Sequence, residues 1–257
     1  MRFILFLNAC RPKQWVKNLL CLSAIIITPN TSALFPNISL ATLSFIFASS
    51  TIYLINDTLD IKYDRNHPNK KYRPIASGKI KIWEAIVLAI VLISLSLYIA
   101  SIINFKFFLI ISLYLIAQLF YCFIGKNLVL IDIYLISLGF VLRAMGGVFA
   151  LNSFPSYWFL VTTGSMSLFL AIQKRKSELS RVEPQSYQIR KVLKKYSINF
   201  LEKIELITLT SGFISYMLWA SGPIFNGAES SFMLLTCPVL LMGILRYEFI
   251  SGIKKNG

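Results

Sequence analysis

The chain alternates long apolar runs with short polar connections. Eight runs are about long enough to cross the hydrocarbon core of a bilayer as helices, which takes roughly 20 residues. They cover about residues 19–35, 38–55, 83–103, 107–124, 128–150, 157–173, 206–222 and 232–250. No alternation with a period of two marks a strand, and hydrocarbon leaves free backbone groups unsatisfied. The pattern therefore predicts an all-α, polytopic bundle of about eight transmembrane helices.

Composition agrees with a membrane protein. Of the 257 residues, 56% are hydrophobic and only 14% are charged, whereas soluble domains carry about 25% charged residues. The formal net charge of +15 would suggest a nucleic-acid partner in a soluble protein. In this chain the cations lie between the apolar runs, so we expect no nucleic-acid partner. The four cysteines are far apart in sequence, which argues against both a disulfide framework and a zinc site.

The basic residues give an orientation. If all eight runs span the membrane, 24 of the 26 Lys and Arg residues fall on one side, and that side is the cytoplasm. Both termini are then cytoplasmic, in an inner or plasma membrane. We expect a single domain over 1–257, with an interfacial segment over 1–18 and cytoplasmic loops over 56–82 and 174–205. The oligomeric state, including a homo-oligomer, is left open.

Three of the eleven acidic residues lie together at the cytoplasmic end of the second run. Asp57, Asp60 and Asp64 are spaced so that a continuing helix would place them on one face, with Asn56 beside Asp60. Like charges on neighbouring turns repel, and a divalent cation would relieve this. Oxygen ligands of this kind suit Mg²⁺. We therefore predict that Asn56, Asp57, Asp60 and Asp64 bind Mg²⁺ and that the aspartates are catalytic.

Basic residues follow the carboxylates directly. Arg65, Lys70 and Arg73 lie in the next nine positions. An acidic cluster for a metal beside a basic cluster for an anion suits a phosphorylated or diphosphate substrate. The alternative is a solvated, ion-paired loop. His67, the only histidine, precedes a proline in this polar segment, which favours a hydrogen-bonding role in the loop over that of a base.

These motifs resemble those of a known superfamily. NDxxDxxxD over residues 56–64, followed by HPxKxxRPIASG over residues 67–78, is similar to the UbiA superfamily of intramembrane prenyltransferases. Within it, the chain resembles the decaprenyl-phosphate phosphoribosyltransferase family. Further matching segments are RPKQWVKN at 11–18, YCFIGK at 121–126, Asp132, GFVLRA at 139–144, QKRKSEL at 173–179 and the Arg246–Tyr247 pair.

The resemblance implies an activity and further site residues. It implies transfer of phosphoribose from phosphoribosyl pyrophosphate (PRPP) to a polyprenyl phosphate such as decaprenyl phosphate. The additional substrate-binding residues that it implies are Lys17, Asn18, Tyr121, Lys126 and Arg143. Most members of the superfamily carry a second aspartate-rich motif where this chain has Lys174, Arg175 and Lys176. This departure suggests that fixed cations replace a second metal and hold phosphate groups of PRPP.

Several alternatives remain at this level. Arg143 lies within an apolar run, where a charge needs a polar partner, so it either contacts a substrate phosphate or forms an internal ion pair, for instance with Asp132. One alternative activity is prenyl transfer from a polyprenyl diphosphate to an aromatic or other acceptor. Another is transport of a lipid phosphate or an anion, with Arg143 and the basic loops lining the path.

Overall fold

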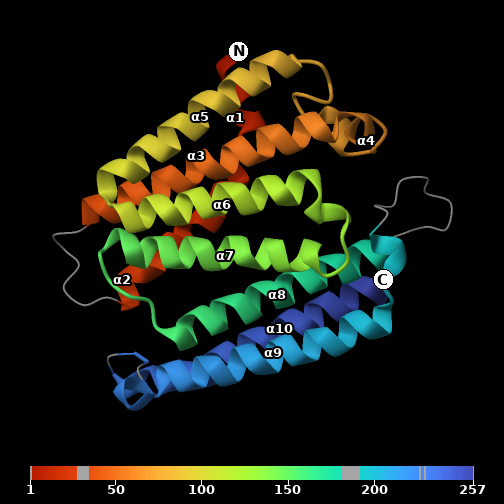
Figure 1. Cartoon of the computed structure of the whole chain (residues 1–257). Coiled ribbons are helices and arrows are strands. Elements are labelled where there is room, and N and C mark those ends of the chain that lie inside the picture. The colour runs from red at the N-terminus through yellow and green to blue at the C-terminus, as the bar shows by residue number, and fades with distance from the viewer. Residues whose placement is uncertain (1, 28–34, 181–191, 226, 229, 257) are drawn as a thin grey trace. The chain divides into compact units, whose positions relative to one another are not determined.

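The computed structural model describes residues 2–27, 35–180, 192–225, 227–228 and 230–256, and every regular element in them is helical (Figure 1). The chain divides into two compact units, Met1–Phe154 and Pro155–Gly257. The α-helices of the first unit are α1 (Arg2–Ala9), α2 (Ala24–Ile27), α3 (Phe35–Leu59), α4 (Ile61–Arg65), α5 (Ile82–Ile103), α6 (Phe105–Phe123) and α7 (Ile131–Ala150). Its 3-10 helices are η1 (Pro12–Ser23), η3 (Lys70–Tyr72) and η4 (Gly125–Asn127).

Among its described residues, the second unit contains three long α-helices. They are α8 (Tyr157–Ser180), α9 (Ile198–Ala220) and α10 (Cys237–Asn256), with the shorter 3-10 helices η5 (Leu193–Lys195), η6 (Gly222–Phe225) and η7 (Ser231–Thr236). Ser197 caps α9, because its hydroxyl accepts a hydrogen bond from the Phe200 amide at 3.2 Å. Between α8 and α9, the Thr162 and Ser215 hydroxyls lie 3.1 Å apart.

Five segments among the described residues are long and apolar enough to cross a membrane. They are Phe35–Leu59, Ile82–Ile103, Phe105–Phe123, Ile131–Ala150 and Ser231–Ile250. The predicted all-α membrane fold is confirmed. The number of eight spans remains a prediction, because α8 and α9 are long helices that fall outside these five. The cytoplasmic position of both termini also remains a prediction.

The first predicted span differs from expectation. Residues 19–23 belong to the 3-10 helix η1, and α2 contributes only four residues after it, while 28–34 lie outside the described residues. Polar contacts hold η1 in place. Trp15 Nε1 donates to Ser50 Oγ at 3.1 Å, Asn18 Nδ2 to Ser49 Oγ at 3.1 Å, and Cys21 Sγ to the Arg143 carbonyl at 3.3 Å. Partners on α3 and α7 therefore fix this segment instead of its own α-helical hydrogen bonds.

Helix α3 is central in the first unit and packs against both α5 and α6 (Figure 1). The Ser44 and Ser96 hydroxyls each donate to the other residue's carbonyl at 2.9 Å, so small residues bring α3 and α5 close together. On the α6 side, the Phe45 ring makes edge contacts with Phe107 and Tyr114, at centroid distances of 5.8 and 5.3 Å. These contacts anchor the first half of α3 against α5 and α6, and the acidic residues lie at the other end of the same helix.

Helix α7 carries a glycine where η1 approaches it. A Cβ atom added to Gly147 would lie 2.1 Å from the carbonyl oxygen of Cys21. Only a residue without a side chain fits at this distance, so Gly147 sets how closely η1 and α7 pack. Arg143, one turn earlier on α7, is thereby placed against η1.

Candidate functional site

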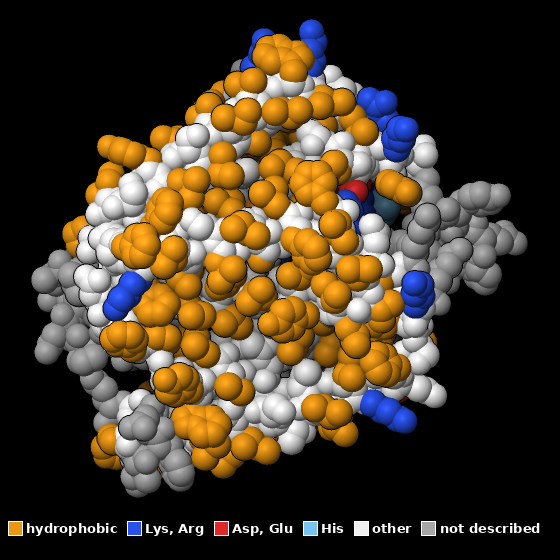
Figure 2. Space-filling view, viewed as in Figure 1, with side chains coloured by type: hydrophobic (Ala, Val, Ile, Leu, Met, Phe, Trp, Pro, Cys, Tyr) orange, Lys and Arg blue, Asp and Glu red, His pale blue; other side chains and the backbone are white. Residues whose placement is uncertain are grey.

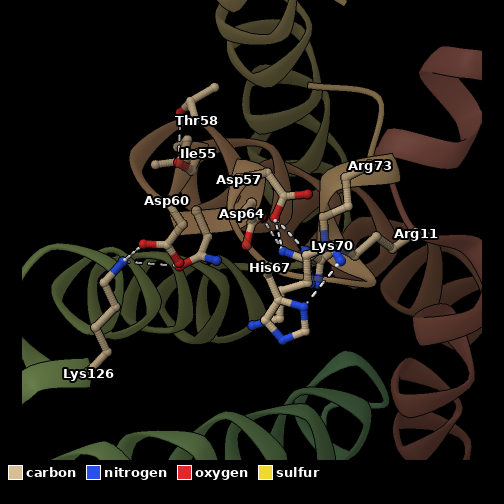
Figure 3. Close-up of polar contacts among 11 residues, drawn as sticks. Arg11, Ile55, Asp57, Thr58, Asp60, Asp64, His67, Lys70, Arg73 and Lys126 are labelled. Carbon is tan, nitrogen blue, oxygen red and sulfur yellow. Dashed lines mark hydrogen bonds and ion pairs between the residues drawn. The ribbon is translucent and has the colours of Figure 1, made fainter. Parts of the chain in front are cut away.

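The acidic segment lies at the junction of α3 and α4. Asp57 is in the last turn of α3, Asp60 is between the helices, and Asp64 is in α4. Helical hydrogen bonds continue through the junction, since the Asp60 amide donates to Asn56 O at 2.9 Å and the Asp64 amide to Asp60 O at 2.8 Å. The three carboxylates nevertheless form two groups (Figure 3). The expected single face is therefore only partly formed.

Two arginines bind the first group of carboxylates. Arg73 Nη1 donates to Asp64 Oδ2 at 2.5 Å and lies 3.3 Å from Asp57 Oδ1. Arg11 forms a short ion pair with the same Asp57 oxygen. Both carboxylates are about 3% exposed, whereas the arginine side chains are about one quarter exposed. The buried carboxylates of Asp57 and Asp64 are thus neutralised by two arginines whose side chains remain partly exposed to solvent.

Arg11 has an unusual backbone. Its φ of 55° and ψ of 65° place it in the left-handed region, at the turn between α1 and η1. For a residue other than glycine this conformation costs roughly 1–2 kcal/mol. Its guanidinium also lies 5.0 Å from the centre of the Tyr53 ring. The contacts with Asp57 and Tyr53 offset that cost and hold the guanidinium in the cluster.

Lys126 binds the second group. Its Nζ donates to Asp60 Oδ1 at 2.6 Å (Figure 3). The same nitrogen lies 3.5 Å from Asn56 Oδ1. Lys126 belongs to η4, which follows α6, so 66 residues separate the ion-pair partners. Two oxygens from one helical turn therefore converge on a single cationic nitrogen.

His67 organises the loop after α4. Its Nδ1 accepts hydrogen bonds from the backbone amides of Asn69 at 3.2 Å and Lys70 at 3.3 Å. These bonds need an unprotonated Nδ1. Partial burial, and then the nearby Lys70 and Arg73 cations, lower the pKa of His67 below its ordinary value, although Asp64 acts in the opposite direction. The hydrogen-bonding role expected for this histidine is confirmed, and Lys70 is positioned beside it.

Arg143 lies inside the first unit and is 6% exposed. Its Nε donates to Asn18 Oδ1 at 2.8 Å, Nη1 to the Gly139 carbonyl at 2.8 Å, and Nη2 to Tyr114 Oη at 2.7 Å. The guanidinium also lies 4.9 Å from the centre of the Tyr114 ring. The buried guanidinium is therefore stabilised by hydrogen bonds to neutral groups of η1, α6 and α7.

The remaining predicted residues of the first unit lie in different surroundings. Lys17 is exposed and lines a surface groove with Phe140, while Tyr121 is half-buried against the hydrophobic core. Arg65 is exposed, and its Nε donates to the Ala76 carbonyl at 3.0 Å. Arg65 lines a groove whose lining includes none of the three aspartates. The structure thus brings Arg73 and Lys126 to the carboxylates but does not bring Arg65 there.

In the second unit, the predicted cations lie near the end of α8. Lys174 is exposed, whereas Arg175 is fully buried and its Nη1 donates to Glu178 at 2.6 Å. Lys176 Nζ lies 2.7 Å from Glu205 and 3.2 Å from Glu202, both on α9. Arg175 and Lys176 therefore form ion pairs within this unit. Their predicted role in holding PRPP phosphates stays a prediction.

The donor chemistry suits Mg²⁺, which takes one or two carboxylates and leaves other positions for water and substrate oxygens. Within the described residues, no group of three His, Cys, Asp or Glu side chains is gathered closely enough for a protein-only metal site. Two pairs of oxygen donors do converge on a cation. Asn56 and Asp60 converge on Lys126, and Asp57 and Asp64 on Arg73. Each pair therefore supplies oxygen ligands of the kind that a divalent cation such as Mg²⁺ prefers.

Sequence reasoning missed some members of these networks. Arg11 was noted only as part of a matching segment, although it contacts Asp57 directly. Its position in the basic stretch just before the first apolar run was the available signal. No sequence signal marked Tyr114 or Ser49, because tyrosine and serine are common inside apolar runs. Glu205, in the second unit, also had no sequence signal.

Comparisons with known proteins place the chain in a family. Residues 18–255 match the model of the UbiA prenyltransferase family. A decaprenyl-phosphate phosphoribosyltransferase of Mycolicibacterium smegmatis is 34% identical, over 94% of this chain and 80% of that protein. The Corynebacterium glutamicum protein of the same name is 39% identical, over 83% of this chain and 66% of its own length.

Solved structures agree. A UbiA homologue from Archaeoglobus fulgidus, bound to DMAPP and Mg²⁺, superposes with a TM-score of 0.76 at 25% identity, covering 95% of this chain and 86% of that one. The predicted family is confirmed by both kinds of comparison. This chain is a multi-pass membrane transferase that belongs to the UbiA prenyltransferase family.

Proposed function

We propose that the chain transfers 5-phosphoribose from PRPP to a polyprenyl phosphate, such as decaprenyl phosphate, and releases pyrophosphate. The observation that carries this proposal is the cluster at the end of α3, where Asp57, Asp60 and Asp64 meet Arg11, Arg73 and Lys126 (Figure 3). Its charges of both signs suit a metal-bound diphosphate. The names of the curated relatives support the same reaction.

Asn56, Asp57, Asp60 and Asp64 would hold Mg²⁺, which neutralises the negative charge on the leaving diphosphate when bound. Arg73 and Lys126 already lie beside these carboxylates. Their donors serve the diphosphate oxygens as well, since guanidinium and ammonium groups bind phosphate through charge-assisted hydrogen bonds. Fixed cations of this kind stabilise the charge that develops on the leaving group.

The chemistry needs no strong base. A phosphate oxygen of the lipid attacks the anomeric carbon of PRPP, a new carbon–oxygen bond forms, and the bond to the diphosphate breaks. A phosphate monoester has a second pKa of about 6 and is mostly dianionic at neutral pH. It therefore attacks without losing a proton. His67 needs no catalytic role, which agrees with its hydrogen bonds to the loop backbone.

Other predicted residues take supporting roles. Lys17, Lys70 and Tyr121 stay in the proposed substrate-binding set, and Lys174 and Arg175 are proposed to bind the 5-phosphate or the diphosphate of PRPP. Asn18 and Arg143 are bonded to each other, so we assign them to positioning η1 against α7. Arg65 leaves the set because its side chain lies in another groove.

The donor is water-soluble, whereas the acceptor carries a long apolar tail. The cation distribution supports a cytoplasmic position for the end of α3, and we propose that PRPP enters from the cytoplasm. The lipid tail remains in the bilayer, beside apolar helices.

The test is purified full-length protein supplied with radiolabelled PRPP, Mg²⁺ and decaprenyl phosphate. Label should move into the lipid fraction in step with pyrophosphate release. It should stop with EDTA, and also in Asp60→Ala. Activity that persists in Asp60→Ala or without divalent metal would overturn the assigned roles of the metal and Asp60. Pyrophosphate release without lipid labelling would overturn the proposed acceptor.

A second candidate is prenyl transfer from an allylic diphosphate to another acceptor. It is supported by the Archaeoglobus fulgidus homologue structures bound to DMAPP or GPP with Mg²⁺. Supplying allylic diphosphates and PRPP in parallel separates the two reactions. Turnover of allylic diphosphate alone would favour this second candidate.

A further inference from the structure

A groove outside the carboxylate cluster lies in the first unit, where α4 and the following loop meet the start of α5. Its volume is about 510 Å³. Its lining includes Ile61 and Arg65 from α4, Gly78 and Lys81 from the loop, and Trp83 and Ile86 from α5. None of Asp57, Asp60 and Asp64 lines it, so a molecule bound there is separate from the proposed reaction site.

The charged side chains in this lining, Arg65 and Lys81, are both cationic. Glu84, the nearby acid on α5, is engaged elsewhere. It accepts a hydrogen bond from the Lys81 amide at 2.9 Å and pairs with Arg2 at 2.9 Å. Its negative charge is therefore balanced by Arg2, and the groove keeps its positive character. Charge complementarity calls for an anion.

The rest of the groove calls for an apolar chain. Ile82 and Ile86 are about half exposed, Trp83 is 61% exposed, and Ile90 on the next turn is 57% exposed. Ile82, Ile86 and Ile90 are four residues apart, so they form one strip along α5 that leads away from the cations. Figure 2 shows a largely hydrophobic surface over α5 and α6, with Lys and Arg side chains near the start of α5. Tryptophan beside lysine is typical of a segment at the level of lipid head groups.

We propose that this groove binds a membrane phospholipid with an anionic head group, such as phosphatidylglycerol. Arg65 and Lys81 bind the phosphate, and an acyl chain lies along the isoleucine strip. A free phosphate ion would leave the isoleucines and Trp83 uncovered, whereas a zwitterionic lipid would leave two cations without a net negative partner. An anionic phospholipid matches both the two cations and the apolar strip of the groove. It would link α4 to the start of α5.

Trp83 provides the measurement. The full-length protein is placed in phosphatidylcholine nanodiscs that contain a small fraction of either phosphatidylglycerol or phosphatidylcholine with brominated acyl chains, and tryptophan fluorescence is recorded. Two interfacial cations favour an anionic lipid by roughly 30-fold in affinity. Brominated phosphatidylglycerol should therefore quench more strongly. The excess quenching should disappear in Trp83→Phe and in Arg65→Gln/Lys81→Gln.

A matched control is Lys62→Gln/Lys71→Gln, which removes the same charge from exposed lysines that do not line the groove. It should keep the excess quenching. Equal quenching by the two lipids, an excess that survives Arg65→Gln/Lys81→Gln, or an excess abolished by millimolar inorganic phosphate would each overturn the proposal. If the double variant does not fold, Trp83→Phe decides, because an excess that remains there comes from another tryptophan. The readout does not depend on activity.

Discussion

Lys126 and Asp60 form an ion pair at 2.6 Å between η4 and the junction of α3 and α4. The pair is partly buried, with side-chain exposures of 13% and 17%, so water screens it less than a surface pair. Asn56 approaches the same ammonium group. A lysine distant in sequence thus balances the charge of the middle carboxylate of the motif. Removing either side chain should therefore change the position of the other.

Replacing Asp60 by Asn should reduce transfer to the lipid by about 100-fold or more, because the site loses the charge that orients Lys126 and is proposed to bind the metal. The rate is measured with labelled PRPP and decaprenyl phosphate. Glu84→Gln removes the same charge from outside the cluster and should retain activity. Wild-type turnover in Asp60→Asn would refute the proposed role of this carboxylate.

Arg73→Gln should lower the free energy of unfolding by about 1–3 kcal/mol, because the buried Asp57 and Asp64 carboxylates lose a shared partner. Denaturation in detergent, followed by circular dichroism, gives the value. Lys62→Gln removes the same charge from an exposed side chain and should change stability by less than about 0.5 kcal/mol. Equal effects of the two substitutions would contradict a special role for Arg73.

Arg143→Gln should destabilise the protein even without substrate. Asn18 and Tyr114 would lose their hydrogen-bond donor inside the first unit, which costs about 1–3 kcal/mol. Arg246→Gln, at an exposed position on α10, is the control. A residue that only bound substrate would leave the unfolding of the free protein unchanged, so that result would refute the positioning role.

Gly147→Ala should destabilise the first unit by about 1–3 kcal/mol, because the new methyl group would collide with the Cys21 carbonyl. Gly243→Ala is the matched control, since it is also helical but has no neighbouring atom within 4 Å of the added Cβ. It should be neutral or slightly stabilising. Thermal unfolding of both variants tests this, and the reverse order of stability would exclude close packing at Gly147.

His67 should titrate below pH 6.5. Its pKa is lowered chiefly by partial burial and then by Lys70 and Arg73. The unfolded chain then binds more protons near this pH, so the stability contributed by the neutral imidazole is present above pH 6.5 and is lost as the pH falls towards the folded-state pKa. Because the chain has one histidine, NMR of histidine-labelled protein reports it directly. A pKa at or above 6.5 would contradict this prediction.

The apolar pattern predicted the regular helices well. The runs at 83–103 and 107–124 correspond to α5 and α6 within two residues, because a polar residue, Asn104, separates them and caps α6 through the Phe107 amide. The site was harder to predict. Motif spacing located the three aspartates, but the turn at Asp60 and the distant Lys126 depend on tertiary packing. The neutral partners of Arg143 likewise come from three separate elements.

The 3-10 conformation of η1 determines which residues of its sequence lie on one face. With three residues per turn, side chains three positions apart lie directly above one another, and Trp15, Asn18 and Cys21 are spaced in this way. Their bonds to Ser50, Ser49 and Arg143 therefore form a single column. In an α-helix each step of three would rotate the column by about 60°. One residue inserted after Trp15 would turn Asn18 and Cys21 a third of a revolution away from α3 and α7.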